Sequence, residues 1–199
     1  MSKKSLLEKI ASKIADCGKC KLCEGKKKKG VPGKGNSEAN VMLIGEAPGH
    51  MEEIKGEPFV GAAGKFLDKL LSHSGLSREE VYITNVVKCR PAENRELKSN
   101  DVASCGRYLD KEIDIIQPKL IVTLGKHSTA YILSKTGLEF SGITKIHGKL
   151  FATSLLGLHV NVFSTFHPAA ALYNPKYKEM LQSDFEKLGK IVRGEDFSE

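Results

Sequence analysis

Residues 120–134 read LIVTLGKHSTAYILS and change from one periodicity to another within a single stretch. Leu120 to Leu124 form a continuous apolar run rich in β-branched residues, which predicts a buried strand. Gly125 interrupts the run, and residues 126–134 have the spacing of a short helix. A buried strand followed at once by a helix is the repeating unit of a parallel sheet with helices packed on its faces.

The same alternation continues on both sides of this stretch. Three further apolar runs predict strands: 41–44, 81–84 and 159–165. Helical spacing occurs in four further segments: the N-terminus up to Asp16, 66–71, 100–116 and 175–192. We therefore expect an α/β fold with three layers, α/β/α, around a central, mainly parallel four-stranded sheet. A hairpin or loop is expected between Gly137 and Leu156, and residues 1–199 are expected to form a single domain.

Charge and hydropathy narrow the functional class. Lys and Arg outnumber Asp and Glu by 31 to 24, so the formal net charge is +7 at pH 7. A basic chain favours a polyanionic partner such as nucleic acid. The run Lys26–Lys29 is interpreted as a solvated loop, with phosphate contact as the alternative. No apolar run of about 18 residues and no signal-peptide pattern is present, so we expect a soluble, cytoplasmic protein without membrane association.

The chain contains five cysteines. Because the cytosol keeps thiols reduced, they are predicted to be metal ligands or buried thiols rather than disulfide partners. Cys17, Cys20 and Cys23 lie in a Gly- and Lys-rich segment, residues 17–36, which is predicted to be a loop.

Polar residues directly follow the predicted strands: Glu46 after Gly45, Asn85, Lys126 after Gly125, and His167. In parallel sheets, ligands bind at the carboxyl ends of the strands. We therefore expect a carboxylate, an amide and an imidazole to converge on one rim. Each residue also has a plainer interpretation: a tight turn for residues 45–49, a core position for Phe59, and a packing role for His167.

Six stretches, taken in order, match one known family: GEAPG at 45–49, EPFVGAAG at 57–64, YITNVVKCRP at 82–91, Leu124–Gly125, ITKIHG at 143–148 and FHPAAAL at 166–172. From about Cys17 to Leu188 the chain resembles the iron-sulfur uracil-DNA glycosylases called family 4. The resemblance implies a monomeric enzyme of base excision repair. Such an enzyme hydrolyses the N-glycosidic bond of uracil in single- or double-stranded DNA and leaves an abasic site.

The resemblance also implies roles for individual residues. Glu46 would position or deprotonate water, and His167 would donate a hydrogen bond to the departing uracil. Leu172 would wedge into the base stack of the DNA. The residues expected to contact the base are Gly45, Ala47, Glu52, Phe59 and Asn85.

The family's ligand spacing implies a [4Fe-4S] cluster held by Cys17, Cys20, Cys89 and Cys105. The cluster would connect residues 1–36 to the region of residues 89–105. A four-cysteine zinc site is the chemical rival. Cys23 is interpreted as a non-ligand, and the triple of Cys17, Cys20 and Cys23 is the alternative set.

Two positions depart from the family. Tyr173 replaces a common Arg after Leu172, which puts a contact to the DNA backbone in doubt, and Ile54 replaces a frequent basic residue at the pocket rim. Three alternative functions remain open at this point: a non-catalytic module that binds uracil or damaged DNA, a glycosylase for deaminated purines, and a cluster-bearing redox protein.

Overall fold

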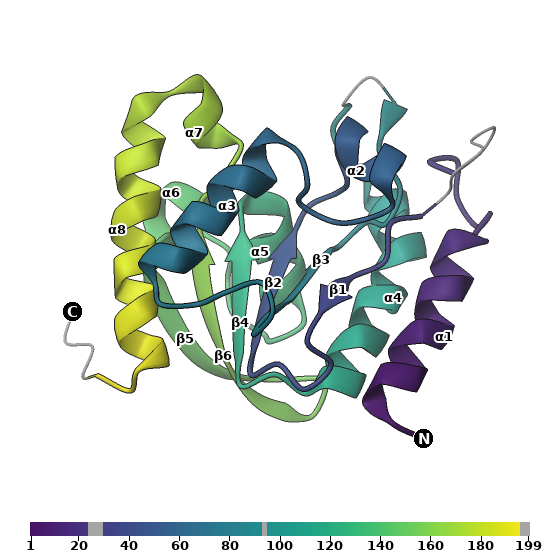
Figure 1. Ribbon diagram of the computed structural model, residues 1–199, viewed down its shortest axis with the longest axis horizontal. Coiled ribbons are helices and arrows are strands. Elements are labelled where there is room, and N and C mark those ends of the chain that lie inside the picture. Colours follow the sequence, from purple (N-terminus) through teal and green to yellow (C-terminus); the bar gives the residue numbers. More distant parts are fainter. Residues whose placement is uncertain (24–29, 93–94, 196–199) are drawn as a thin grey trace.

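A computed structural model of the protein describes residues 1–23, 30–92 and 95–195 (Figure 1). The basic run Lys26–Lys29 lies outside the described residues. The chain forms a six-stranded sheet in the order β1-β3-β2-β4-β6-β5. The strands are β1 (Lys34–Gly35), β2 (Val41–Gly45), β3 (Tyr82–Asn85), β4 (Leu120–Leu124), β5 (Lys149–Leu155) and β6 (Leu158–Thr165).

The predicted α/β class is confirmed, but the expectation of four strands is wrong. The four predicted strands form the parallel centre β3-β2-β4-β6. An antiparallel strand is added at each edge: β1 pairs with β3, and β5 pairs with β6 in a hairpin that turns at Leu156 and Gly157. Edge strands are harder to predict because β1 has only two residues and β5 exposes much of its length, so neither forms a buried apolar run.

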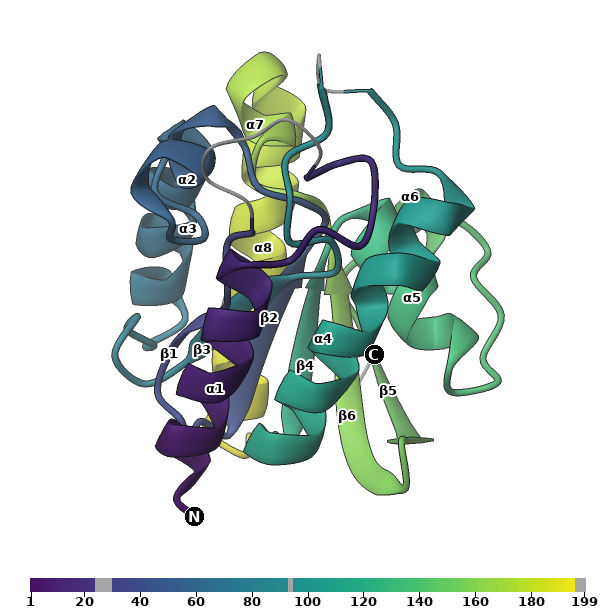
Figure 2. The same cartoon turned by 90° about the vertical axis from the view of Figure 1, so that its right-hand side faces the viewer.

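Helices cover both faces of the sheet (Figures 1 and 2). On one face lie α1 (Lys3–Ala15), α4 (Ser99–Ile116) and α5 (Lys126–Ser134), and on the other lie α3 (Ala62–His73) and α8 (Pro175–Val192). Three short helices complete the described fold: α2 (His50–Lys55), α6 (Ile143–Ile146) and α7 (Ala170–Tyr173). No helix in the described ranges is long and apolar enough to cross a membrane.

Side chains of the central strands alternate between two hydrophobic clusters. In β2, Met42 and Ile44 pack with α1 residues such as Ile14, whereas Leu43 packs with Leu67 of α3 and Phe185 of α8. All six residues are fully buried. Burial on both faces explains why the parallel strands are continuously apolar in sequence. It also fixes the carboxyl ends of four parallel strands at one edge, where polar residues follow them.

Candidate active site

A cavity of about 320 Å³ opens at the carboxyl edge of the parallel strands. Its lining includes Glu46, Ala47, Glu52, Phe59, Asn85 and His167. The structure therefore brings together residues that the sequence separates by more than a hundred positions. Each of these residues was predicted either to contact the base or to act in breaking the N-glycosidic bond.

Gly45 ends β2 and pairs with Asn85 across the sheet. A Cβ atom at this position would lie 2.4 Å from the Asn85 Oδ1 atom and 2.6 Å from the Cζ atom of Phe59. Real carbon atoms do not approach that closely, so any side chain here would displace both residues. Glycine therefore permits the close packing of an amide and an aromatic ring at the base of the cavity.

Asn85 ends β3 and is only 2 % exposed. Its Oδ1 atom is buried and has no hydrogen-bond partner among the residues that the structure describes. A buried polar atom without a partner costs about 1–3 kcal/mol and is rare in folded proteins. Its position in the wall of a cavity indicates that a ligand supplies the missing hydrogen bond.

Phe59 is held in an unusual backbone conformation. Its φ angle is +53°, in the left-handed region that non-glycine residues rarely occupy. Its carbonyl oxygen accepts a hydrogen bond from the Arg78 guanidinium, and it approaches Gly64 so closely that no Cβ would fit there. The ring stacks on the imidazole of His167 with centroids 5.6 Å apart and an interplanar angle of 28°. Such backbone strain is concentrated at functional sites.

Glu52 of α2 lines the same cavity, but one of its carboxylate oxygens is engaged within the protein. Its Oε1 atom accepts hydrogen bonds from the backbone N–H groups of Val60 and Gly61, both at 2.8 Å. The side chain therefore connects α2 to the turn that follows Phe59. Helix α2 was not predicted from the sequence, since six residues are too few to display a clear period.

His167 lies two residues beyond the end of β6. Its Nδ1 atom accepts a hydrogen bond from the backbone N–H of Ala169 at 3.1 Å. Desolvation lowers the pKa of His167 to about 4, and the nearby Glu52 carboxylate only partly opposes this effect. At pH 7 the imidazole is therefore neutral. Because Nδ1 is an acceptor, the single proton is on Nε2, which is a hydrogen-bond donor.

Glu46 follows β2 at the rim of the cavity. Desolvation raises the pKa of its carboxyl group, while His127 and Lys126 act in the opposite direction. The Nε2 atom of His127 lies 3.7 Å from the Glu46 Oε1 atom. Sequence reasoning missed His127, although its place two residues beyond Gly125, at a predicted strand end, was an available signal.

Leu172 lies in α7, on the segment that follows His167. Leu172 is 48 % exposed, and the neighbouring Tyr173 is 87 % exposed. Two large apolar or aromatic side chains therefore project from the segment that carries the imidazole.

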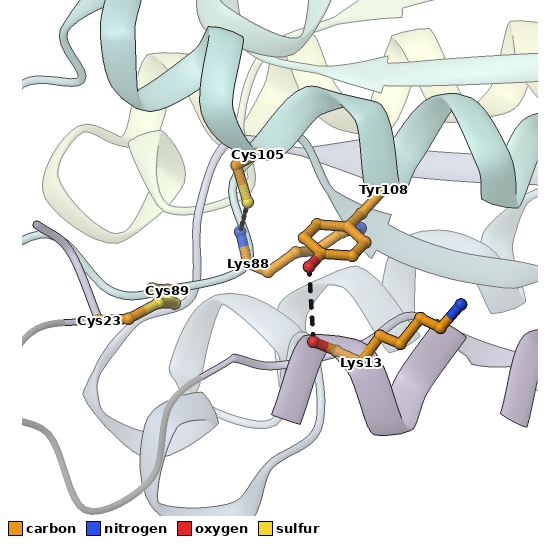
Figure 3. Close-up of a disulfide and its surroundings, with 6 residues drawn as sticks. All are labelled: Lys13, Cys23, Lys88, Cys89, Cys105 and Tyr108. Carbon is orange, nitrogen blue, oxygen red and sulfur yellow. Dashed lines mark hydrogen bonds between the residues drawn. A yellow bond between two sulfur atoms is a disulfide. The ribbon is translucent and has the colours of Figure 1, made fainter. Parts of the chain in front are cut away.

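Cys23 and Cys89 meet where the segment after α1 approaches the segment after β3, and Cys105 lies nearby on α4 (Figure 3). Cys23 and Cys89 are joined by a disulfide bond across a Cα–Cα distance of 5.9 Å. This bond corrects the expectation that no cysteine is a disulfide partner. Sequence spacing could not indicate the pairing, because 66 positions separate the two residues.

The other three cysteines are free thiols. Cys17 and Cys20 are partly buried against the hydrophobic cluster that contains Cys23, Cys89 and Cys105. The Sγ atom of Cys105 accepts a hydrogen bond from the backbone N–H of Lys88 at 3.0 Å, as Figure 3 shows. Burial raises the pKa of Cys105 to about 11, and Cys20 and Cys17 add to this effect. Within the described ranges, no three His, Cys, Asp or Glu side chains are arranged around a common metal position.

Comparison with known proteins agrees with this geometry. The sequence profile of the uracil DNA glycosylase superfamily matches residues 32–189. A protein named type-4 uracil-DNA glycosylase from Sulfurisphaera tokodaii is 50 % identical over 187 residues, which cover 94 % of this chain and 84 % of the relative. Proteins with the same name are 48 % identical in Saccharolobus solfataricus, over 94 % of this chain and 86 % of the relative, and 45 % identical in Archaeoglobus fulgidus, over 93 % and 92 %. The chain therefore belongs to the uracil-DNA glycosylase superfamily.

Proposed function

We propose that this chain hydrolyses the N-glycosidic bond of uracil in DNA and leaves an abasic site in an intact strand. The observation that carries the proposal is the buried, unpaired Oδ1 atom of Asn85 in the wall of the cavity. The names of the relatives support uracil as the base and DNA as the polymer. A base within a duplex is out of reach, so the enzyme would extrude the nucleotide into this cavity.

Asn85 would read the Watson–Crick edge of the base. Its Oδ1 atom would accept the uracil N3–H, and its amide nitrogen would donate to O4. Cytosine presents an acceptor at N3 and a donor at position 4, which reverses both requirements. A site built on such hydrogen bonds rejects the wrong base strongly, because the protein groups would then be buried without partners.

Other cavity residues would hold the ring in place. Phe59 would stack on the face of the uracil, and backbone N–H groups of residues 45–47 would meet its oxygen atoms. Glu52 would act on the base through the turn that it fixes at Val60 and Gly61. The segment from Glu46 to Ile54 would exclude the methyl group of thymine.

In the bond-breaking step, the C1′–N1 bond breaks and its electron pair leaves with the uracil. The Nε2–H of neutral His167 would donate to O2, where negative charge develops. Glu46 would orient a water molecule toward C1′, accept its proton as the C1′–O bond forms, and balance positive charge on the sugar. This assignment requires an ionised Glu46 and an uncharged His167 at the same pH.

Contacts to the DNA strand would come from the surface around the cavity. Leu172 would fill the gap that the extruded base leaves in the stack. The net charge of +7 favours association with phosphates, and the substrate would be single- or double-stranded DNA.

We further propose that Cys17, Cys20, Cys89 and Cys105 hold a [4Fe-4S] cluster. The donor chemistry fits, since thiolates are the ligands of such clusters, and Cys17 and Cys20 lie close enough to Cys105 to raise its pKa. Ligation by Cys89 requires that a thiol reductant first supply two electrons and two protons to the Cys23–Cys89 bond. When bound, the cluster would serve as a structural connection between the segment after α1 and the segments around Cys89 and Cys105. Zinc is the rival metal, and metal analysis with visible absorption distinguishes the two.

The test is base release from oligonucleotides containing one U·G pair, one U·A pair, one T·G pair, one hypoxanthine or xanthine, or single-stranded uracil. Purified, cluster-bearing protein should release uracil only, and alkali should then cleave the strand at the abasic site. Glu46→Gln and Asn85→Ala should each slow release at least about 100-fold. Binding of uracil DNA without release would instead support a binding module, and release of the purine bases would support a different substrate.

A further inference from the structure

A buried ion pair lies directly beside the carboxyl end of β3. The Lys88 Nζ atom is 2.6 Å from the Glu112 Oε2 atom, and each side chain is 1 % exposed. Removing two charges from water is unfavourable, and an apolar pair of similar size is often as stable or more stable. A fully buried pair of this kind is therefore weak evidence for a role in stability. Its contacts indicate another role.

The ammonium group of Lys88 makes three hydrogen bonds, which is its full capacity. Besides Glu112, it donates to the Thr84 Oγ1 atom at 2.5 Å and to the backbone carbonyl oxygen of Asn85 at 2.8 Å. Thr84 and Asn85 are the last two residues of β3. One charged group therefore fixes the end of the strand that carries the amide.

Glu112 is itself held rigidly on α4. Its Oε1 atom accepts from the backbone N–H of Gly33 at 3.1 Å and from the hydroxyl of Tyr82 at 3.3 Å. Its Oε2 atom accepts from the hydroxyl of Thr84 at 2.9 Å as well as from Lys88. Because every partner is buried or part-buried, these hydrogen bonds hold Glu112 in place, and Glu112 in turn fixes the position of the Lys88 ammonium.

The backbone of the same segment connects two other parts of the site. The N–H groups of Val86 and Val87 donate to the carbonyl oxygens of Gly45 and Glu46, each at 3.0 Å. The N–H of Lys88 donates to the sulfur of Cys105 (Figure 3). Residues 85–88 thus lie between the cavity and the cysteines, and the Lys88 side chain supports them from within the core.

We propose that Lys88, held by Glu112, is a positioning residue for Asn85. The proposal rests on the proposed uracil-excising function. The Oδ1 atom of Asn85 has no partner among the described residues, so it is not anchored by a hydrogen bond of its own. Its direction therefore depends on the backbone, and the bond from Lys88 to the Asn85 carbonyl fixes that peptide plane. Lys88 touches neither the base nor the reacting atoms and acts through Asn85.

The test replaces both charges together, since Lys88→Met alone would leave Glu112 buried without its partner. Lys88→Met/Glu112→Met should melt at a lower temperature than the wild type, because the Gly33 N–H and the Tyr82 hydroxyl lose their acceptor, but it should fold and keep the visible absorption of the cluster. Its single-turnover rate of uracil release should nevertheless fall about 100-fold, because a displacement of about 1 Å in a positioning group has effects of this size. In an Asn85→Ala background, the same double change should cause no further loss.

The Asn85→Ala background separates positioning from a structural role. A structural role would slow both backgrounds equally, so equal losses, or a double variant as fast as the wild type, would overturn the proposal. If the methionine pair does not fold, Lys88→Gln/Glu112→Gln can be compared in the same two backgrounds. The glutamine at position 88 is shorter than lysine, so it cannot reach all three acceptors of Lys88. Failure of the proposed function is distinguishable, since the wild-type protein itself would then release no uracil.

Discussion

The backbone N–H of Ala169 donates to the Nδ1 atom of His167 at 3.1 Å, so the neutral imidazole of His167 carries its proton on Nε2. Ala169 follows His167 by only two residues, and the bond is therefore built into the turn after β6. Desolvation, which lowers the pKa of His167 to about 4, keeps the ring uncharged. The turn and the burial together produce a neutral donor that faces the cavity.

The first prediction concerns acid stability. The pKa of His167 is about 4 in the native protein, below the ordinary value of 6.5. As the pH falls from about 6.5 to about 4, the unfolded chain binds a proton here before the native chain does. The stability associated with the neutral ring is complete above pH 6.5 and is lost across this window. His167→Asn should therefore lose less melting temperature between pH 7 and pH 5 than the wild type.

Equal losses in the two proteins would contradict the depressed pKa. His159, an exposed histidine of β6, provides the control, and His159→Asn should behave as the wild type does.

The second prediction concerns the pH dependence of uracil release. Glu46 must be ionised to accept a proton, so the rate should fall as the pH falls through its raised pKa. His127, when protonated, lowers the pKa of Glu46. His127→Gln should therefore move the acid limb of the pH–rate profile to higher pH. Glu96 raises the same pKa, so Glu96→Gln should move the limb in the opposite direction. Shifts of the same sign in both variants would contradict this assignment.

The third prediction tests the close packing at Gly45. The methyl group of Gly45→Ala would overlap Asn85 and Phe59, so uracil release should fall at least about 100-fold, with a loss of about 1–3 kcal/mol in the free energy of unfolding. Release assays and urea unfolding measure the two effects. Gly18→Ala is the matched control, because its methyl group would have no atom within 4 Å apart from those of its chain neighbours. A fully active Gly45→Ala protein would show that the cavity is not the base site.

These residues also show which parts of the fold the sequence could predict. The strand at residues 120–124 was predicted with its observed bounds because both of its faces are buried. The convergence of polar residues at one rim could also be predicted, because parallel strands place their carboxyl ends at the same edge of the sheet. Strand β5 lacked such a signal, because it is an edge strand and much of it is exposed.

The parts of the site that sequence reasoning missed depend on tertiary distances. Lys88 and Glu112 are 24 positions apart, and neither spacing nor composition indicates that their side chains meet in the core. The same is true of the bond between Cys23 and Cys89. His127 differs, because its place just beyond a predicted strand end could have indicated that it lies near Glu46. A buried lysine is especially hard to predict, because the residue type is almost always exposed.

The fourth prediction tests how Asn85 selects the base. In Asn85→Asp an ionised carboxylate can accept hydrogen bonds but cannot donate to O4 of uracil. Uracil release should fall at least about 100-fold, and the ratio of uracil to cytosine release should fall with it, since the carboxylate can accept from the amino group of cytosine. Parallel assays on U·G and C·G duplexes measure the ratio. An unchanged ratio would indicate that other groups read this edge of the base.

The last prediction concerns Leu172, which is exposed on α7, directly after the cavity-lining residues His167 and Ala169. A wedge compensates for the loss of stacking in a duplex, whereas a single strand has little stacking to disrupt. Leu172→Ala should therefore slow release from a U·A duplex by about 10-fold, the equivalent of about 1.4 kcal/mol, and should change release from single-stranded DNA much less. Leu138, another exposed leucine, provides the control, and Leu138→Ala should leave both rates unchanged. Equal slowing on both substrates would mean that Leu172 shapes the cavity and does not act on the base stack.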